Sequence, residues 1–228
     1  MALASRNEMA ETSTMSNQEL DTTILELLAS RICHDLISPV GAVHNGVEFL
    51  EEMGAENGAE AITLIAHSAS MATSRLQAFR LAYGAGGRDP NIKPEDVHKT
   101  FADLIQGDGK VTQEWDPYGD LGYGDDRPEG FCKMLMGALM LAMEALPKGG
   151  NISVSAGERK TIISAKGEDA LVRDQVDAAL ARTISTSNLD PRLVHPFALS
   201  VLAHSYNFSI EVAEIAAGHV EYTLSYHG

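Results

Sequence analysis

The sequence has few cysteines, few basic residues and no long apolar run. Cys33 and Cys132 are not spaced as a Cys-x-x-Cys pair, so neither a disulfide framework nor a cysteine zinc site is expected. The 17 Lys and Arg against 32 Asp and Glu give a net charge of −15, whereas nucleic acid and anionic membranes bind basic surfaces. No stretch approaches the ~20 apolar residues that span a bilayer, and residues 1–14 lack the apolar run of a secretion signal. We therefore expect a cytoplasmic protein that binds neither nucleic acid nor membrane.

Two long amphipathic helices are predicted in the first part of the chain. Residues 1–15 have no periodicity and are expected to form a flexible lead-in. Ser16 with Glu19 fits a capping box, and the first helix should run from there to about Met53. The second helix is predicted over residues 59–83, where apolar residues recur at spacings of three and four. The short connection between the two helices predicts an antiparallel hairpin over residues 16–83.

Such a hairpin cannot enclose a core by itself, because each helix keeps an open apolar side. Two hairpins related by a two-fold axis would form a four-helix bundle, which predicts a homodimer. The alternative is that the rest of the same chain covers the open side.

A second domain is predicted after a linker at residues 84–94, which is rich in Gly and Pro. Helices are expected at residues 94–104, 127–146, 169–183 and 190–206. Strands are expected at residues 109–115, 151–156, 161–165, 209–217 and 219–226. The fold class is therefore α+β, with the helical hairpin followed at residues 95–228 by an α/β sandwich that layers helices on a mainly antiparallel sheet.

His34 lies in the middle of the first predicted helix and is followed directly by Asp35. Successive steps of three or four residues from His34 reach six positions on its face, which are small or polar except for Leu27: Leu27, Ser30, Arg31, Ser38, Gly41 and Asn45. The opposite face is apolar: Leu25, Leu28, Ile32, Leu36, Val40, Val43, Val47 and Leu50. We therefore expect the histidine to point outward from a helix that packs on its other side.

Pro39 lies inside the same helix, five residues after His34. It has no N–H, and its ring crowds the carbonyl of Asp35, at a cost of ~3 kcal/mol for an interior proline. A helix end at Pro39 is the alternative, but the apolar periodicity continues to Leu50. This strain beside His34 favours a functional histidine over a solvated one without a task.

The run His34-Asp35-Leu36-Ile37-Ser38-Pro39-Val40 resembles the H-box of sensor histidine kinases. In that motif the phospho-accepting histidine precedes an acid and an apolar residue, and a proline follows. The longer run Cys33–Ala42 is very similar to that of the ChpT-type histidine phosphotransferases.

The second domain resembles the ATP-binding domain of those kinases in a degenerate form. Pro147-Lys148-Gly149-Gly150 matches a Pro-x-Gly-Gly turn of that domain. However, Leu141 stands where an asparagine would help to hold Mg²⁺, and Ala165-Lys166-Gly167 stands where an Asp-x-Gly element would recognise adenine. No Gly-rich lid segment precedes Asp190. The resemblance therefore implies a chain that binds no ATP and no cofactor of its own.

The resemblance further implies a homodimer that is phosphorylated on His34 and transfers the group between receiver domains of a hybrid kinase and of response regulators. His34 and Asp35 would be the catalytic residues, with Asp35 orienting one ring nitrogen while the other attacks. The receiver would supply Mg²⁺. Six residues are expected to contact the partner: Leu27, Ser30, Arg31, Ser38, Gly41 and Asn45. The alternatives are an atypical ATP-dependent histidine kinase and a non-catalytic dimeric scaffold or kinase inhibitor.

Overall fold

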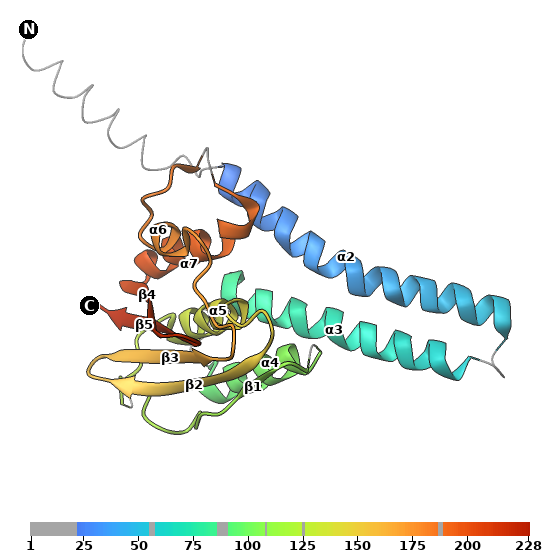
Figure 1. Ribbon diagram of the computed structural model, residues 1–228, viewed down its shortest axis with the longest axis horizontal. Coiled ribbons are helices and arrows are strands. Elements are labelled where there is room, and N and C mark those ends of the chain that lie inside the picture. The colour runs from blue at the N-terminus through green and yellow to red at the C-terminus, as the bar shows by residue number, and fades with distance from the viewer. Residues whose placement is uncertain (1–21, 55–57, 86–90, 108, 125, 187–188) are drawn as a thin grey trace, which may run out of the picture.

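The computed structural model describes residues 22–54, 58–85, 91–107, 109–124, 126–186 and 189–228. The expected lead-in at residues 1–15, the capping box at Ser16 and the middle of the linker lie outside the described residues. A helical hairpin is followed by a domain of helices on a five-stranded sheet, which confirms the predicted α+β fold class (Figure 1).

The hairpin consists of α2 (Thr22–Met53) and α3 (Ala59–Tyr83), and α3 has the predicted bounds. Helix α2 continues through Pro39, so this proline does not mark a helix end. Gly46 is buried where α2 meets α3, and a Cβ at this position would lie 2.6 Å from Cγ1 of Ile65. The absence of a side chain at Gly46 therefore lets the two helices approach closely.

The sheet of the second domain has the strand order β1-β2-β3-β5-β4. Its strands are β1 (Val111–Gln113), β2 (Gly150–Gly157), β3 (Lys160–Lys166), β4 (Phe208–Ala216) and β5 (His219–Tyr226). β1 is parallel to β2 and all the other pairs are antiparallel, as the prediction of a mainly antiparallel sheet required.

The helices of this domain are α4 (Pro94–Gln106), α5 (Phe131–Glu144), α6 (Val176–Leu180) and α7 (Val194–Ser205). The short 3-10 helix η4 (Pro191–Leu193) leads into α7, and Asp190 caps it by accepting a hydrogen bond from the N–H of Arg192. The helix predicted over residues 169–183 is wrong, because only α6 forms there. The N–H groups of Leu171 and Val172 donate instead to the Ala145 carbonyl and the Glu214 carboxylate.

Helix α5 forms the centre of the core. Its residues 131–142 are all buried. The helix packs against α3 on one side and against β3 and β5 on the other. Burial on both sides explains why this segment of the sequence is apolar all round rather than amphipathic.

Two charged residues on α5 join the second domain to the hairpin. Lys133 and Glu144 are eleven residues apart, close to three helical turns, so they lie on the same face. The Lys133 ammonium donates to the Gly84 carbonyl at the end of α3 over 2.6 Å, and Glu144 contacts Arg31 of α2. The second domain therefore covers one end of the hairpin, while the other end projects beyond it (Figure 1).

None of the helices among the described residues is both long and apolar enough to cross a bilayer. The cytoplasmic location expected from the sequence stays a prediction.

Candidate functional site

His34 lies on the outer face of α2, with 88% of its side chain exposed. The predicted outward orientation is therefore confirmed. Ser30, Ser38 and Asn45 on the same face are also exposed, and a Cβ added to Gly41 would meet no atom within 4 Å. The imidazole is thus open to a macromolecular partner.

Asp35 lies beside the imidazole, with Oδ1 3.3 Å from Nδ1 of His34. When Nδ1 carries the proton, it donates to Asp35 and leaves the lone pair on Nε2. The second carboxylate oxygen of Asp35 lies 3.9 Å from Nε of Arg31, one turn earlier in the helix. The carboxylate therefore lies between the histidine and an arginine.

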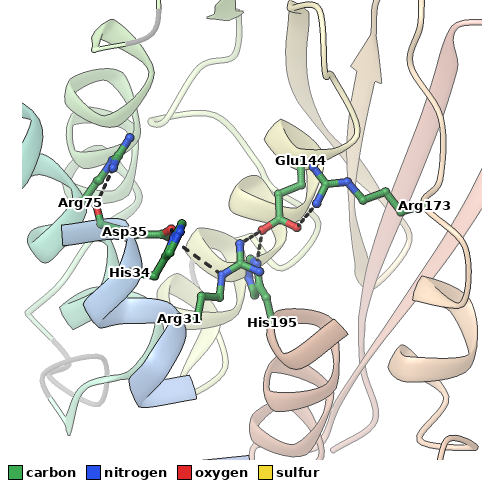
Figure 2. A network of polar contacts seen from close by, with 7 residues as sticks. All are labelled: Arg31, His34, Asp35, Arg75, Glu144, Arg173 and His195. Carbon is green, nitrogen blue, oxygen red and sulfur yellow. Dashed lines mark hydrogen bonds and ion pairs between the residues drawn. The ribbon is translucent and has the colours of Figure 1, made fainter. Parts of the chain in front are cut away.

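The main-chain carbonyl of Asp35 receives a hydrogen bond from Nη1 of Arg75 on α3 (Figure 2). Pro39 has no N–H to donate to this carbonyl, as an ordinary residue four positions later would. Arg75 therefore replaces the missing intrahelical donor beside His34. Arg75 was not predicted from the sequence, although the N–H that Pro39 lacks already indicated that the Asp35 carbonyl needs another donor.

Arg31 is turned toward the second domain. Its Nη2 donates to Oε1 of Glu144, and Nδ1 of His195 lies 2.8 Å from the same oxygen. Arg173 approaches the other oxygen of Glu144, with its Nη1 at 3.5 Å (Figure 2). Arg31 was predicted to contact the partner, but only 20% of its side chain is exposed. Leu27, which carries the same prediction, packs against the core of the second domain.

The charges around Glu144 keep its carboxyl group ionised. Burial alone would raise its pKa, but the charge and hydrogen bond of His195 together with Arg31 and Arg173 outweigh it and lower the pKa from 4.5 to about 2. Sequence reasoning did not find Glu144 or His195. The available signal was that Lys133 and Glu144 are the only charged residues of an otherwise apolar helix.

Two positions that would serve ATP in a kinase-like domain are apolar and buried in this fold. Leu141 is 1% exposed and Ala165 is 0% exposed, and both belong to the core. Among the described residues, no group of three or more His, Cys, Asp or Glu side chains is placed to hold a metal ion. That the chain binds no ATP and no cofactor stays a prediction.

Comparisons with known proteins match this arrangement of domains. The family model for the histidine phosphotransferase C-terminal domain matches residues 94–217. Protein phosphotransferase ChpT from Brucella abortus (strain 2308) is 32% identical over 191 residues, covering 82% of this chain and 88% of that protein.

A solved structure with a similar fold supports this match. This structure, described as a bacterial phosphotransferase, is 27% identical, covers 90% of this chain and 97% of its own, and superposes with a TM-score of 0.71. The histidine kinase AdeS of Acinetobacter baumannii is 11% identical, covering 84% of this chain and 95% of its own, with a TM-score of 0.42.

The helical hairpin with its exposed histidine and the attached domain that matches the family model define a histidine phosphotransferase of two-component signalling. The chain belongs to the ChpT-type family of these phosphotransferases.

Proposed function

We propose that this chain accepts a phosphoryl group on His34 from the aspartate of one receiver domain and passes it to the aspartate of another, without taking phosphate from ATP. The observation that carries this proposal is the exposed imidazole of His34, whose Nδ1 lies beside the Asp35 carboxylate.

The reaction requires a neutral imidazole as the nucleophile. Nε2 of His34 attacks the phosphorus of the aspartyl phosphate, the P–O bond to the aspartate breaks, and a carboxylate leaves. The ring becomes positively charged while Nδ1 keeps its proton, and the adjacent Asp35 carboxylate stabilises that charge. The reverse step transfers the group to the second receiver. Mg²⁺ carried by the receiver would screen the charge of the phosphoryl oxygens.

The buried, apolar positions of the second domain support the absence of ATP-dependent autophosphorylation. Leu141 has no amide to help hold Mg²⁺, and Ala165 has no carboxylate to recognise adenine. Both side chains are part of the buried core. Phosphoryl transfer from ATP depends on such groups for positioning and for charge neutralisation.

The docking surface that we propose for the receiver surrounds His34. Ser30, Ser38 and Asn45 are exposed there, and Gly41 leaves open space between them. Small residues let a partner helix approach the imidazole closely, which an in-line attack requires. Arg31 and Leu27 would act at the inner border of this surface.

We also propose that the chain is a homodimer through the exposed apolar side chains of the hairpin. Ile37, Val40 and Val47 of α2 are 69%, 55% and 41% exposed, at spacings of three and seven residues. Ile62 and Leu76 of α3 are 54% and 55% exposed and are fourteen residues apart. These five residues, called here the apolar stripe, follow the heptad spacing by which helices pack into four-helix bundles. A second copy would cover the stripe.

The function is tested by offering a phosphorylated receiver domain to the wild-type chain, to His34→Ala and to His67→Ala. His67 is another exposed histidine of the hairpin and serves as the matched control. Acid-labile, base-stable label is expected on the wild type and on H67A, and none on H34A. ATP alone should label none of the three. Label taken directly from ATP would show an autokinase, and equal labelling of H34A would remove His34 from the reaction.

A further inference from the structure

We propose that Glu144 is a positioning residue for His34: it holds Arg31 from the second domain, and Arg31 holds the Asp35 carboxylate beside the imidazole. This inference rests on the proposed function of His34. It gives the second domain a part in phosphoryl transfer that requires no nucleotide.

Three consecutive contacts connect Glu144 to the imidazole (Figure 2). Oε1 of Glu144 accepts a hydrogen bond from Nη2 of Arg31. Nε of the same guanidinium lies 3.9 Å from Oδ2 of Asp35. The other oxygen of Asp35, Oδ1, lies 3.3 Å from Nδ1 of His34. Arg31 is therefore the link between the two domains, and one rigid, planar group faces both carboxylates.

Glu144 is a suitable anchor because its own position is fixed. It is the last residue of α5, whose preceding residues are packed in the core, and 14% of its side chain is exposed. Its two oxygens are also held by His195 at 2.8 Å and by Arg173 at 3.5 Å. Lys99 and Asp103 on α4 show the contrast, since their side chains are 78% and 39% exposed. An exposed pair of that kind restrains its members weakly.

The charges explain why Glu144 determines the position of Arg31. Glu144 is the acid that Arg31, His195 and Arg173 share, and its carboxyl group stays ionised at neutral pH. Without this negative charge, the acidic contact of Arg31 among the described residues is Asp35 alone. The guanidinium would then pair more closely with Asp35 and draw its carboxylate away from Nδ1 of His34. The proton of the ring would lose its acceptor, and the tautomer with the lone pair on Nε2 would become less populated.

The test compares Glu144→Gln with Glu158→Gln in the full chain. Gln has nearly the shape of Glu without its charge, and Glu158 is an exposed acid in the turn between β2 and β3. Transfer from a phosphorylated receiver is measured over a range of receiver concentrations. E144Q should lower the maximal transfer rate about tenfold, as a displaced reacting group does, and should leave the half-saturating receiver concentration unchanged. E158Q should match the wild type in both.

A second readout is independent of transfer. The ¹⁵N shifts of the His34 ring report which nitrogen carries the proton, and the Nδ1–H fraction should fall in E144Q and not in E158Q. A merely structural role for Glu144 would not move this fraction. Circular dichroism checks the fold, and if E144Q does not fold, Arg31→Lys breaks the same link from the hairpin and leaves the Glu144–His195 contact intact.

A double-mutant cycle with Arg31→Gln tests whether Glu144 acts through Arg31. E144Q should have no further effect on the maximal rate in the R31Q background. An unchanged rate and ring spectrum in E144Q would overturn the inference, as would additive effects in the cycle. A raised half-saturating concentration at an unchanged maximal rate would assign Glu144 to docking instead. If the wild type itself transfers nothing, the proposed function fails, while the ring spectra still test the link between Glu144 and His34.

Discussion

The hairpin and the second domain bury their apolar side chains to very different extents. In the second domain, large side chains such as Leu139 and Ile163 are 0% exposed. In the hairpin, Ile37 is 69% exposed, and Val40 and Leu76 are each 55% exposed. The second domain thus completes its core within one copy of the chain, whereas the hairpin presents an apolar surface of the kind that binds a partner.

The residues assigned to phosphoryl transfer and those at the nucleotide-binding positions are also divided between the hairpin and the second domain. His34 lies on α2 with most of its side chain exposed. Leu141 and Ala165, which stand where the kinase resemblance expects nucleotide-binding groups, are buried in the core of the second domain. In the proposed reaction, the hairpin provides the reacting group, and the second domain supports it through Glu144. The structure therefore suits a reaction in which a partner brings most of the catalytic groups.

The largest effect is expected from a charge placed on the exposed apolar surface of the hairpin, which should weaken the proposed dimer. Val40→Glu places a charge in the middle of the apolar stripe of each copy. The dissociation constant of the dimer should rise about 100-fold or more, since two apolar side chains of about 1.5–3 kcal/mol each are lost from the interface. Sedimentation equilibrium of the full chain measures the change.

Ile215→Glu is the matched control for this variant. Ile215 is 53% exposed, but it lies on β4 of the second domain, outside the apolar stripe. Its replacement should leave the dissociation constant unchanged. Equal weakening by both substitutions, or a V40E chain that dimerises like the wild type, would contradict the proposed interface.

Features that depend on consecutive residues, such as helix bounds and the exposed face of a helix, are predicted well from the sequence. The heptad spacing from Ile62 to Tyr83 gave the bounds of α3, because regular apolar periodicity is a property of consecutive residues. The outward orientation of His34 followed from the same reasoning. The length of α6 was predicted wrongly because the N–H of Leu171 bonds to Ala145, and a helical pattern cannot show such a distant partner.

The contacts between the domains were beyond prediction for a similar reason. Arg31 and Glu144 are 113 positions apart, and nothing in the spacing of either helix indicates their pairing. From the sequence, Arg31 was expected to contact the partner, because it lies one helical turn before His34. Its position was decided instead by a charged residue at the end of a buried helix, which only the packing of the two domains brings close.

Lowering the pH should reduce the contribution of Glu144 to the free energy of unfolding, an effect smaller than that of V40E on the dimer. Its pKa is lowered from 4.5 to about 2 in the folded protein, so its stabilising contribution is complete above pH 4.5 and is lost as the pH falls toward 2. The difference in free energy of unfolding between the wild type and E144Q should therefore shrink with acidification, by up to about 3 kcal/mol. Urea denaturation at neutral and acidic pH measures it, and a difference that grows on acidification would contradict the assigned charge state.

The smallest effect is expected at Arg75, which tests whether the hairpin supports His34 without the second domain. Arg75→Met removes the donor that Pro39 cannot provide, so the Asp35 carbonyl loses its partner at a cost of about 1–3 kcal/mol. In a Pro39→Ala background the helix regains its own N–H at this position, and the same Arg75→Met substitution should cost much less.

Arg80→Met controls for the loss of charge, because Arg80 is an exposed arginine of the same helix. Urea denaturation of the four variants of the cycle measures the coupling. Equal costs in both backgrounds would mean that Arg75 stabilises the hairpin in some way other than by replacing the missing hydrogen bond.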